Sequence, residues 1–154
     1  MIMAESAVRL VATSVVRFAN DEFLLSGEVI PGAPTQPDTV AATYAVFDAR
    51  LMANGAEAEE AALGRVEMFV YPERLLIDGL IRLEITAGRR QRGAGRRLIQ
   101  ALAATAPDYR LNIYDIQPAA LDFWIALGCA FRPRGAGLDA SYVLPLALRA
   151  ASVD

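Results

Sequence analysis

The chain has 154 residues, of which 55% are hydrophobic and 21% are charged, and its formal net charge at pH 7 is −3. This length and composition indicate one globular domain with a sizeable core and exclude a disordered chain. The negative charge argues against a surface that binds nucleic acid. The chain has no histidine and one cysteine, Cys129. This excludes a histidine-based triad and an internal disulfide framework, and it argues against a zinc site.

No apolar run reaches the roughly 18 to 20 residues that a membrane-spanning helix needs. The first ten residues include Glu5 and lack the basic start that is typical of a secretory signal. We therefore expect a cytoplasmic protein that has no membrane partner.

The first thirty residues contain two apolar runs, 8–18 and 22–30, which predict two strands. A hairpin is the preferred interpretation, and a strand followed by a short helix also fits. Three prolines in the stretch Pro31–Pro37 predict a loop. The next segment predicts a helix that Asp38 or Thr39 caps and Asn54-Gly55 ends. Apolar residues recur there at helical spacing, namely Val40, Tyr44, Phe47 and Leu51.

The rest of the chain alternates strand and helix signals. Residues 56–62, AEAEEAA, are polar and are expected to be solvated. The later predicted elements are strands at 64–72 and 75–86, a helix at 96–107, a strand at 111–116, a helix from Pro118 to Gly128, and strands at 131–134 and 141–146. This order predicts an α/β or α+β sheet domain.

One short segment concentrates positive charge. Arg89–Arg97 reads RRQRGAGRR and joins the apolar strand at 75–86 to the helix at 96–107. Glycine lets a backbone approach a ligand closely, and the first turn of a helix offers unpaired N–H groups and a positive dipole end. Arginine side chains add full charges. The segment therefore predicts a site for a pyrophosphate group.

The same segment resembles the acyl-CoA signature of the GNAT superfamily of N-acyltransferases, Arg/Gln-x-x-Gly-x-Gly/Ala, with Arg90–Gly95 in the matching positions. The preceding strand ends Leu83-Glu84-Ile85, which is similar to the family's L-x-V. A second family motif, which runs from a strand through the next helix, is similar in spacing to residues 111–129. The resemblance covers residues 64–146, and residues 1–60 match no detail of the family.

The resemblance implies one α+β domain over residues 1–154, with a central mixed, mostly antiparallel sheet flanked by helices. Residues 64–146 would form the core that binds CoA, and residues 1–60 would shape the acceptor side. The backbone of Leu83 and Ile85 would pair with the pantetheine arm of the co-substrate, an acetyl-CoA or another acyl-CoA. The amides from Gln91 to Arg96 would hold the pyrophosphate. The residues implied in cofactor binding are Leu83, Ile85, Arg90, Gln91, Arg92, Gly93, Ala94, Gly95, Arg96, Gln117 and Phe123.

The family's usual acid and base positions hold residues that cannot do that work here. The slot of the frequent tyrosine acid holds Trp124, whose indole N–H gives up no proton. One usual base position holds Asn112, which can only hold a water, and two others hold Gly79 and Ile81.

Substitutes are available nearby. Glu84 is a candidate base, although strict alternation turns it away from the face of Leu83 unless a β-bulge re-aims it. Tyr114 is a candidate acid, and Tyr142 is a weaker one. Trp124 is interpreted as core, with a role in lining the substrate pocket as the alternative.

Two functions follow from these observations. The first is an N-acyltransferase that moves an acetyl or other acyl group from acyl-CoA to a primary amine of a small molecule or protein. The alternative is an inactive module of the same fold that binds acyl-CoA or a protein partner. No metal is expected, and a homodimer is a plausible assembly because of the high hydrophobic content.

Overall fold

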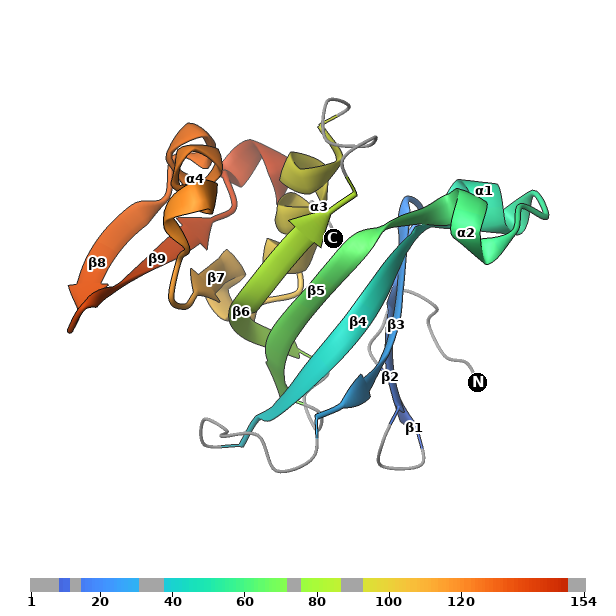
Figure 1. Ribbon diagram of the computed structural model, residues 1–154, viewed down its shortest axis with the longest axis horizontal. Helices are drawn as coiled ribbons and strands as arrows, with labels where there is room; N and C mark the ends of the chain where they lie inside the picture. Colours follow the sequence, from blue (N-terminus) through green and yellow to red (C-terminus); the bar gives the residue numbers. More distant parts are fainter. Residues whose placement is uncertain (1–8, 12–14, 31–37, 72–75, 87–92, 150–154) are drawn as a thin grey trace.

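The computed structural model describes residues 9–11, 15–30, 38–71, 76–86 and 93–149, and side chains from residue 19 onward. These residues form one nine-stranded sheet in the order β1-β2-β3-β4-β5-β6-β7-β9-β8 (Figure 1). The strands are β1 (Arg9–Val11), β2 (Val15–Ala19), β3 (Phe23–Val29), β4 (Val40–Asp48), β5 (Ala62–Tyr71), β6 (Leu76–Ile85), β7 (Arg110–Ile113), β8 (Ala130–Arg134) and β9 (Gly137–Val143).

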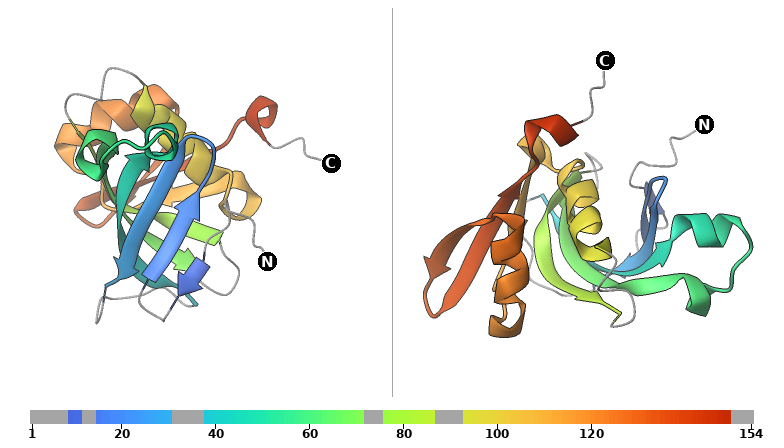
Figure 2. Two further views of the ribbon diagram at one scale, coloured as in Figure 1. Left: turned by 90° about the vertical axis from the view of Figure 1, so that its right-hand side faces the viewer. Right: turned by 90° about the horizontal axis from the view of Figure 1, so that it is seen from above.

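The helices are few and short. They are α1 (Ala49–Ala53), α2 (Ala58–Ala61), α3 (Ala94–Ala103) and α4 (Leu121–Leu127), with 3₁₀ turns η2 (Pro107–Tyr109), η3 (Pro118–Ala120) and η4 (Leu146–Leu148). Every pair of neighbouring strands is antiparallel except β6 and β7, which are parallel. The expected fold class, a mixed and mostly antiparallel sheet with helices, is therefore confirmed. The sheet is strongly curved, and α3 lies within the curve (Figure 2).

The predicted N-terminal hairpin is confirmed, because β2 pairs with β3 in antiparallel register from Val15–Glu28 to Ala19–Leu24. The alternative of a strand and a short helix is wrong. Asn20 shapes the turn by accepting hydrogen bonds from the amides of Glu22 and Phe23. The predicted loop at residues 31–37 lies outside the described residues.

The helix predicted from residue 38 onward is wrong up to residue 48, because residues 40–48 form the long strand β4. Its predicted end at Asn54-Gly55 is confirmed, since α1 ends at Ala53 with Asn54 as its C-cap. Ala42, Tyr44 and Val46 alternate inward and are fully buried, with strands on both sides. Pairing on two edges and burial of every second residue override the helical spacing of the apolar residues. The helix begins only after Asp48, which accepts hydrogen bonds from the amides at 50 and 51 and so caps α1.

The polar segment 56–62 is exposed at its glutamates, as predicted, but residues 58–61 form α2 and Ala61 is buried. In the C-terminal half, the alternation of strand and helix is confirmed. Helix α4 ends at Gly128, whose φ of 84° is the left-handed conformation that suits glycine at a helix end. Leu98, Ile99 and Leu102 of α3 pack into the common core.

Strand β6 is irregular, and its irregularity places the candidate site. Its pairing with β5 skips Asp78, between the pairs Val70–Ile77 and Phe69–Gly79, and skips Ile81 in the same way. Each skipped residue is a β-bulge. Because cross-strand partners share a face, Leu80, Leu83 and Ile85 lie on the core face with Met68 and Val66. Gly79, Arg82 and Glu84 lie on the other face with Phe69, Glu67 and Arg65.

Candidate active site

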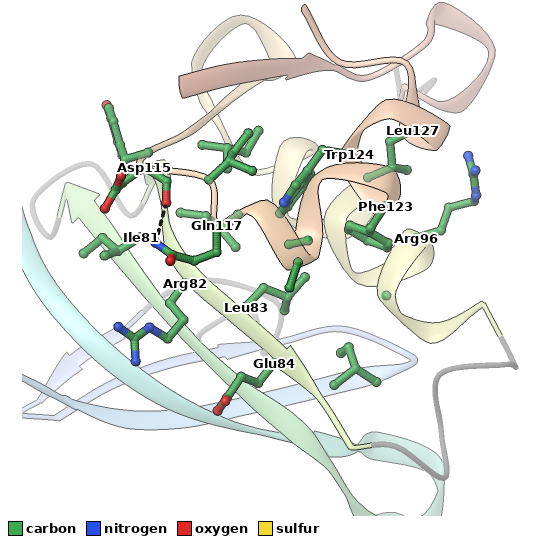
Figure 3. A pocket seen from close by; sticks show the side chains of 18 of the residues that line it. Ile81, Arg82, Leu83, Glu84, Arg96, Asp115, Gln117, Phe123, Trp124 and Leu127 are labelled. Carbon is green, nitrogen blue, oxygen red and sulfur yellow. Dashed lines mark hydrogen bonds between the residues drawn. The ribbon is translucent and has the colours of Figure 1, made fainter. Parts of the chain in front are cut away.

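A cleft opens where β7 leaves β6. The two strands pair only at Gly79–Asn112 and Leu80–Ile113, and the amide of Tyr114 donates to the carbonyl of Leu80 at 2.9 Å. Strand β6 continues to Ile85 without β7 beside it. The cleft left there has a volume of about 910 Å³ and lies between β6, the start of α3, the segment after β7 and α4 (Figure 3).

The walls of the cleft are mostly apolar. Leu83 and Ile85 come from β6, and Phe123 and Trp124 come from α4. The two aromatic rings meet edge to face, with centroids 4.8 Å apart. Trp124 is only 4% exposed and also lines the cleft. It therefore belongs to the core and to the wall of the cleft at the same time. Its indole lies in the wall of the cleft in Figure 3.

The start of α3 closes one end of the cleft. Gly93, with φ of 71°, precedes the helix, and no side chain that the structure describes caps the helix amides. Gly93, Gly95 and Arg96 line the cleft, so the positive end of the helix dipole faces it. Arg96 is exposed and donates to the carbonyl of Ala126 on α4 at 3.2 Å.

Gly95 has a packing role that the sequence did not predict. A Cβ there would lie 3.1 Å from Cε1 of Phe123, so the glycine lets α3 and α4 approach each other. Arg97 turns away from the cleft and forms an ion pair with Glu22 at 2.6 Å, next to the turn between β2 and β3. The predicted phosphate ligands Arg90, Gln91 and Arg92 lie outside the described residues.

The segment after β7 forms another wall, and a buried carboxylate holds it. Asp139 of β9 accepts the amide of Asp115 at 2.9 Å and the guanidinium of Arg134 at 2.6 Å. The hydrogen bond from Arg134 lowers the pKa of Asp139 below its usual range, and the Asp115 amide adds to this effect. Gln117, which was expected to lie alongside the cofactor, lines the cleft, and its side chain donates to the carbonyl of Asp115 at 3.2 Å.

A cluster of polar side chains lies at the point where β7 leaves β6. Asp78 accepts hydrogen bonds from the hydroxyls of Tyr114, at 2.7 Å, and Tyr71, at 3.1 Å. The side-chain amide of Asn112 donates to the Asp78 carbonyl at 3.3 Å and reaches Oδ1 at 3.5 Å. The ring of Tyr114 packs edge to face on Phe69. We call these four residues, Tyr71, Asp78, Asn112 and Tyr114, the Asp78 cluster.

Asp78 is a residue that the sequence analysis missed. The signal in the sequence is the pair Asp78-Gly79 inside an apolar run, since a glycine in a strand often marks a bulge. Gly79 is needed here because a Cβ would lie 2.6 Å from the backbone oxygen of Asn112 and 2.8 Å from the ring of Tyr114.

The structure brings some of the predicted catalytic residues together and separates others. Tyr114 lines the cleft and Asn112 adjoins it in the Asp78 cluster. Glu84 is among the residues that border the cleft, but it lies across from Arg65 on the face opposite Leu83, and neither bulge of β6 changes that. Figure 3 shows its side chain directed away from Phe123. Tyr142 is buried beside Leu111, away from the residues that line the cleft.

Tyr114 holds its proton tightly. Burial, then the hydrogen bond to Asp78 and the negative charge of Asp78, raise the pKa of Tyr114. The phenol donates its single proton to Asp78 and therefore does not point it into the cleft.

The described residues contain no group of three or more His, Cys, Asp or Glu side chains that could hold a metal ion. Among the helices that the structure describes, none has the length and apolar character needed to cross a membrane.

No family model matches the chain, and no curated protein matches it. Among solved structures, the chain is similar to the crystal structure of an acetyltransferase from Thermus thermophilus, with 25% identity and a TM-score of 0.44. The match covers 72% of this chain and 66% of that chain, which is less than two thirds of its length. The likeness is distant, and function has to be argued from the cleft itself.

Proposed function

We propose that the protein is an acyl-CoA N-acyltransferase, which moves an acetyl or other acyl group from acyl-CoA to a primary amine. One observation carries the proposal. Strand β6 loses its neighbour after Leu80, and the cleft that opens there ends at the start of α3. A long ligand with an anionic group at one end fits this shape, because its anion meets the helix N-terminus and its arm lies along the edge of β6 beyond its pairing with β7.

The parts of acyl-CoA have matching places in this arrangement. The pyrophosphate binds at Gly93 to Arg96. The pantetheine arm lies beside Leu83 and Ile85, beyond the point where β7 stops pairing with β6. The acyl end then reaches the point where Tyr114 still bonds to Leu80. Acyl-CoA acts as a co-substrate, and the proposal requires no metal.

The reaction is a direct transfer. The amine nitrogen attacks the thioester carbonyl carbon, so a C–N bond forms and the C–S bond breaks. The amine loses one proton and the departing sulfur of CoA gains one, directly or through water. Backbone N–H groups of β6 next to the end of its pairing with β7 are suited to stabilise the developing oxyanion.

One observation favours a second candidate, a module that binds acyl-CoA without catalysis. Trp124 cannot protonate a thiolate, and Tyr114 donates its proton to Asp78. Either function requires binding in the cleft, and only the transferase releases free CoA in the presence of an amine.

The first experiment is calorimetric titration of the protein with acetyl-CoA and with CoA. Ala119 is exposed and lines the cleft, so Ala119→Trp fills the cleft without disturbing the core. We expect this variant to lose binding. Ala58→Trp is the matched control, since Ala58 is exposed on α2 and does not line the cleft. Equal binding by both variants would show that the cleft is not the site.

The second experiment separates the two candidates. Release of free thiol from acetyl-CoA is measured with a panel of primary amines. Release that depends on an amine, and that Ala119→Trp abolishes, supports the transferase. Binding without release for every amine supports the module.

A further inference from the structure

We propose that the Asp78 cluster binds the positively charged amine of the acceptor, and that Asp78 is the carboxylate that selects a cationic substrate. This inference rests on the proposed transferase activity, because it assigns the acceptor's place beside the acyl group. It names the acceptor class as an aliphatic ammonium compound.

The first observation is that Asp78 has no cationic partner among the described residues. The ion pairs found in the described part of the chain join Arg97 to Glu22 and Arg134 to Asp139. Asp78 is partly exposed and is held by two phenols and an amide, all of them neutral donors. A carboxylate that is held by neutral donors, and that has no cationic partner in the described part of the chain, is suited to bind a cation.

The second observation concerns the direction of the hydrogen bonds. Tyr114 and Tyr71 both donate their single proton to Asp78. The Tyr114 oxygen therefore has only lone pairs to offer a further partner, and the carboxylate has lone-pair capacity beyond its present bonds. A primary ammonium carries three N–H donors and no acceptor. The cluster thus matches an ammonium group and repels an anion.

The third observation is the local charge and the aromatic surroundings. The negative charges of Asp78 and Asp139 both raise the pKa of Tyr114. The rings of Phe69 and Tyr114 meet edge to face beside the carboxylate, with centroids 5.6 Å apart. Aromatic rings stabilise a nearby cation through their π electrons.

The fourth observation is location. The cluster lies at the last point of contact between β6 and β7, where Tyr114 bonds to Leu80. Tyr114 lines the cleft and also touches Asp78. An acyl group that arrives along the edge of β6 would therefore lie beside the amine held at Asp78. The bound ammonium loses one proton to water, and the neutral nitrogen then attacks the thioester carbonyl carbon. The bulge at Asp78 has a function in this scheme, since it turns the carboxylate toward Tyr71 and Tyr114.

The test uses the full chain and 1,4-diaminobutane as the probe, with 1,4-butanediol as its uncharged counterpart. Calorimetry should detect binding of the diamine and not of the diol. Asp78→Asn keeps the size and a hydrogen-bond acceptor but removes the charge, so diamine affinity should fall about tenfold or more. Glu67→Gln is the matched control, because it removes a charge from the same face of the sheet on β5 and should leave affinity unchanged.

A second variant guards against a folding defect in Asp78→Asn. Tyr114→Phe removes one oxygen acceptor and keeps the ring on Phe69, so diamine affinity should fall about fivefold. Urea unfolding shows whether both variants are folded. In turnover assays, Asp78→Asn should raise the KM for the amine more than it lowers kcat.

Acetyl-CoA binding, measured on the same preparations, separates this inference from the proposed function. If Asp78→Asn binds acetyl-CoA like the wild type and loses the diamine, the amine site is supported. If the wild type binds acetyl-CoA but not the diamine, or if Asp78→Asn and Glu67→Gln bind the diamine equally, the amine site is wrong and the transferase stands. If acetyl-CoA fails to bind, the proposed function is wrong, whatever the diamine does.

Discussion

The two edges of β6 show how one strand serves both stability and function. Along one edge β6 pairs with β5 over its whole length, from Leu76 to Ile85, and the bulges at Asp78 and Ile81 are absorbed. Along the other edge it pairs with β7 at Gly79 and Leu80 and then faces a cleft. The edge paired with β5, which we call the closed edge, contributes to the core, and the other edge, which we call the open edge, borders the cleft next to the Asp78 cluster.

The largest expected effect comes from replacing Trp124, which lies in the wall of the cleft. Trp124→Ala should lower the free energy of unfolding by about 3–5 kcal/mol, because a nearly buried indole is lost and a cavity remains. The variant should also lose acetyl-CoA binding, since Trp124 lines the cleft. Urea unfolding and calorimetry measure the two effects.

Ile125→Ala is the control for this change. Ile125 follows Trp124 on the same helix but is 54% exposed, so its removal should change stability by about 0.5 kcal/mol or less. If the two variants were equally stable, α4 would not be packed against the cleft as the structure shows.

The next effect concerns the pairing of β6 with β7. Gly79→Ala places a Cβ against the backbone of Asn112 and the ring of Tyr114, and overpacking of this kind costs roughly 1–3 kcal/mol. The variant should also disturb the Asp78 cluster, so diamine binding should weaken while the β5 edge stays paired. Hydrogen exchange should show faster exchange at the Tyr114 amide than at amides of β5.

Gly137→Ala tests whether any glycine substitution in this sheet has that effect. Its Cβ would lie 3.2 Å from the side-chain oxygen of Asp115, which can move, and 3.4 Å from the backbone oxygen of Arg134, which is an ordinary contact distance. A smaller loss of stability is expected. If Gly137→Ala lost as much stability as Gly79→Ala, the packing of β6 against β7 at Gly79 would not be unusually tight.

The closed edge was largely predictable from the sequence, and the open edge only in part. The apolar run at 75–86 predicted β6, and Gly93 and Gly128 marked the ends of the loop before α3 and of α4. The glycine-rich loop and the helix after it predicted a ligand site, and Gly93, Gly95 and Arg96 of this region line one end of the cleft. These features depend on local patterns of a few residues.

Other features depend on contacts distant in the chain, which local patterns do not encode. Val40, Tyr44 and Phe47 have the spacing of a helix, but β4 forms because β3 and β5 pair with it on both sides. Asp78 joins residues from β5, β6 and β7, and the bulge that presents it is visible only once those strands are placed. The direction of Tyr114's proton depends on the same arrangement.

The stabilisation that Asp139 of β9 contributes to the folded protein should depend on pH. The pKa of Asp139 is lowered in the folded protein, chiefly by Arg134. A lowered pKa means that the stabilisation is present above the unfolded value of about 3.9 and is lost as pH falls through the folded value. Asp139→Asn should therefore be less stable than the wild type at neutral pH, and the two should converge in acid.

The Asp115 amide provides a second measurement for this change. It donates to Asp139, so its hydrogen exchange should speed up in Asp139→Asn at neutral pH. Asp122→Asn, an exposed carboxylate on α4, should leave both stability and exchange unchanged. A difference between Asp139→Asn and the wild type that grew in acid would contradict the assigned ion pair.

The smallest expected effect is a change in the reactivity of Cys129 rather than in stability. It tests whether α4 stays in place as one wall of the cleft. Cys129 follows α4, and its amide donates to the carbonyl of Trp124 at 3.3 Å. Burial raises the pKa of the Cys129 thiol to about 11, and only the thiolate reacts with iodoacetamide. The alkylation rate of the native protein should therefore rise with a midpoint near pH 11, while the urea-unfolded chain reacts with a midpoint of about 8.5.

Trp124→Ala, assayed where it is still folded, should move the midpoint of Cys129 alkylation down because it admits water beside the thiol. Native alkylation as fast as that of the unfolded chain at about pH 8 would mean that the end of α4 opens readily, and that the wall of the cleft is less rigid than the closed edge of β6.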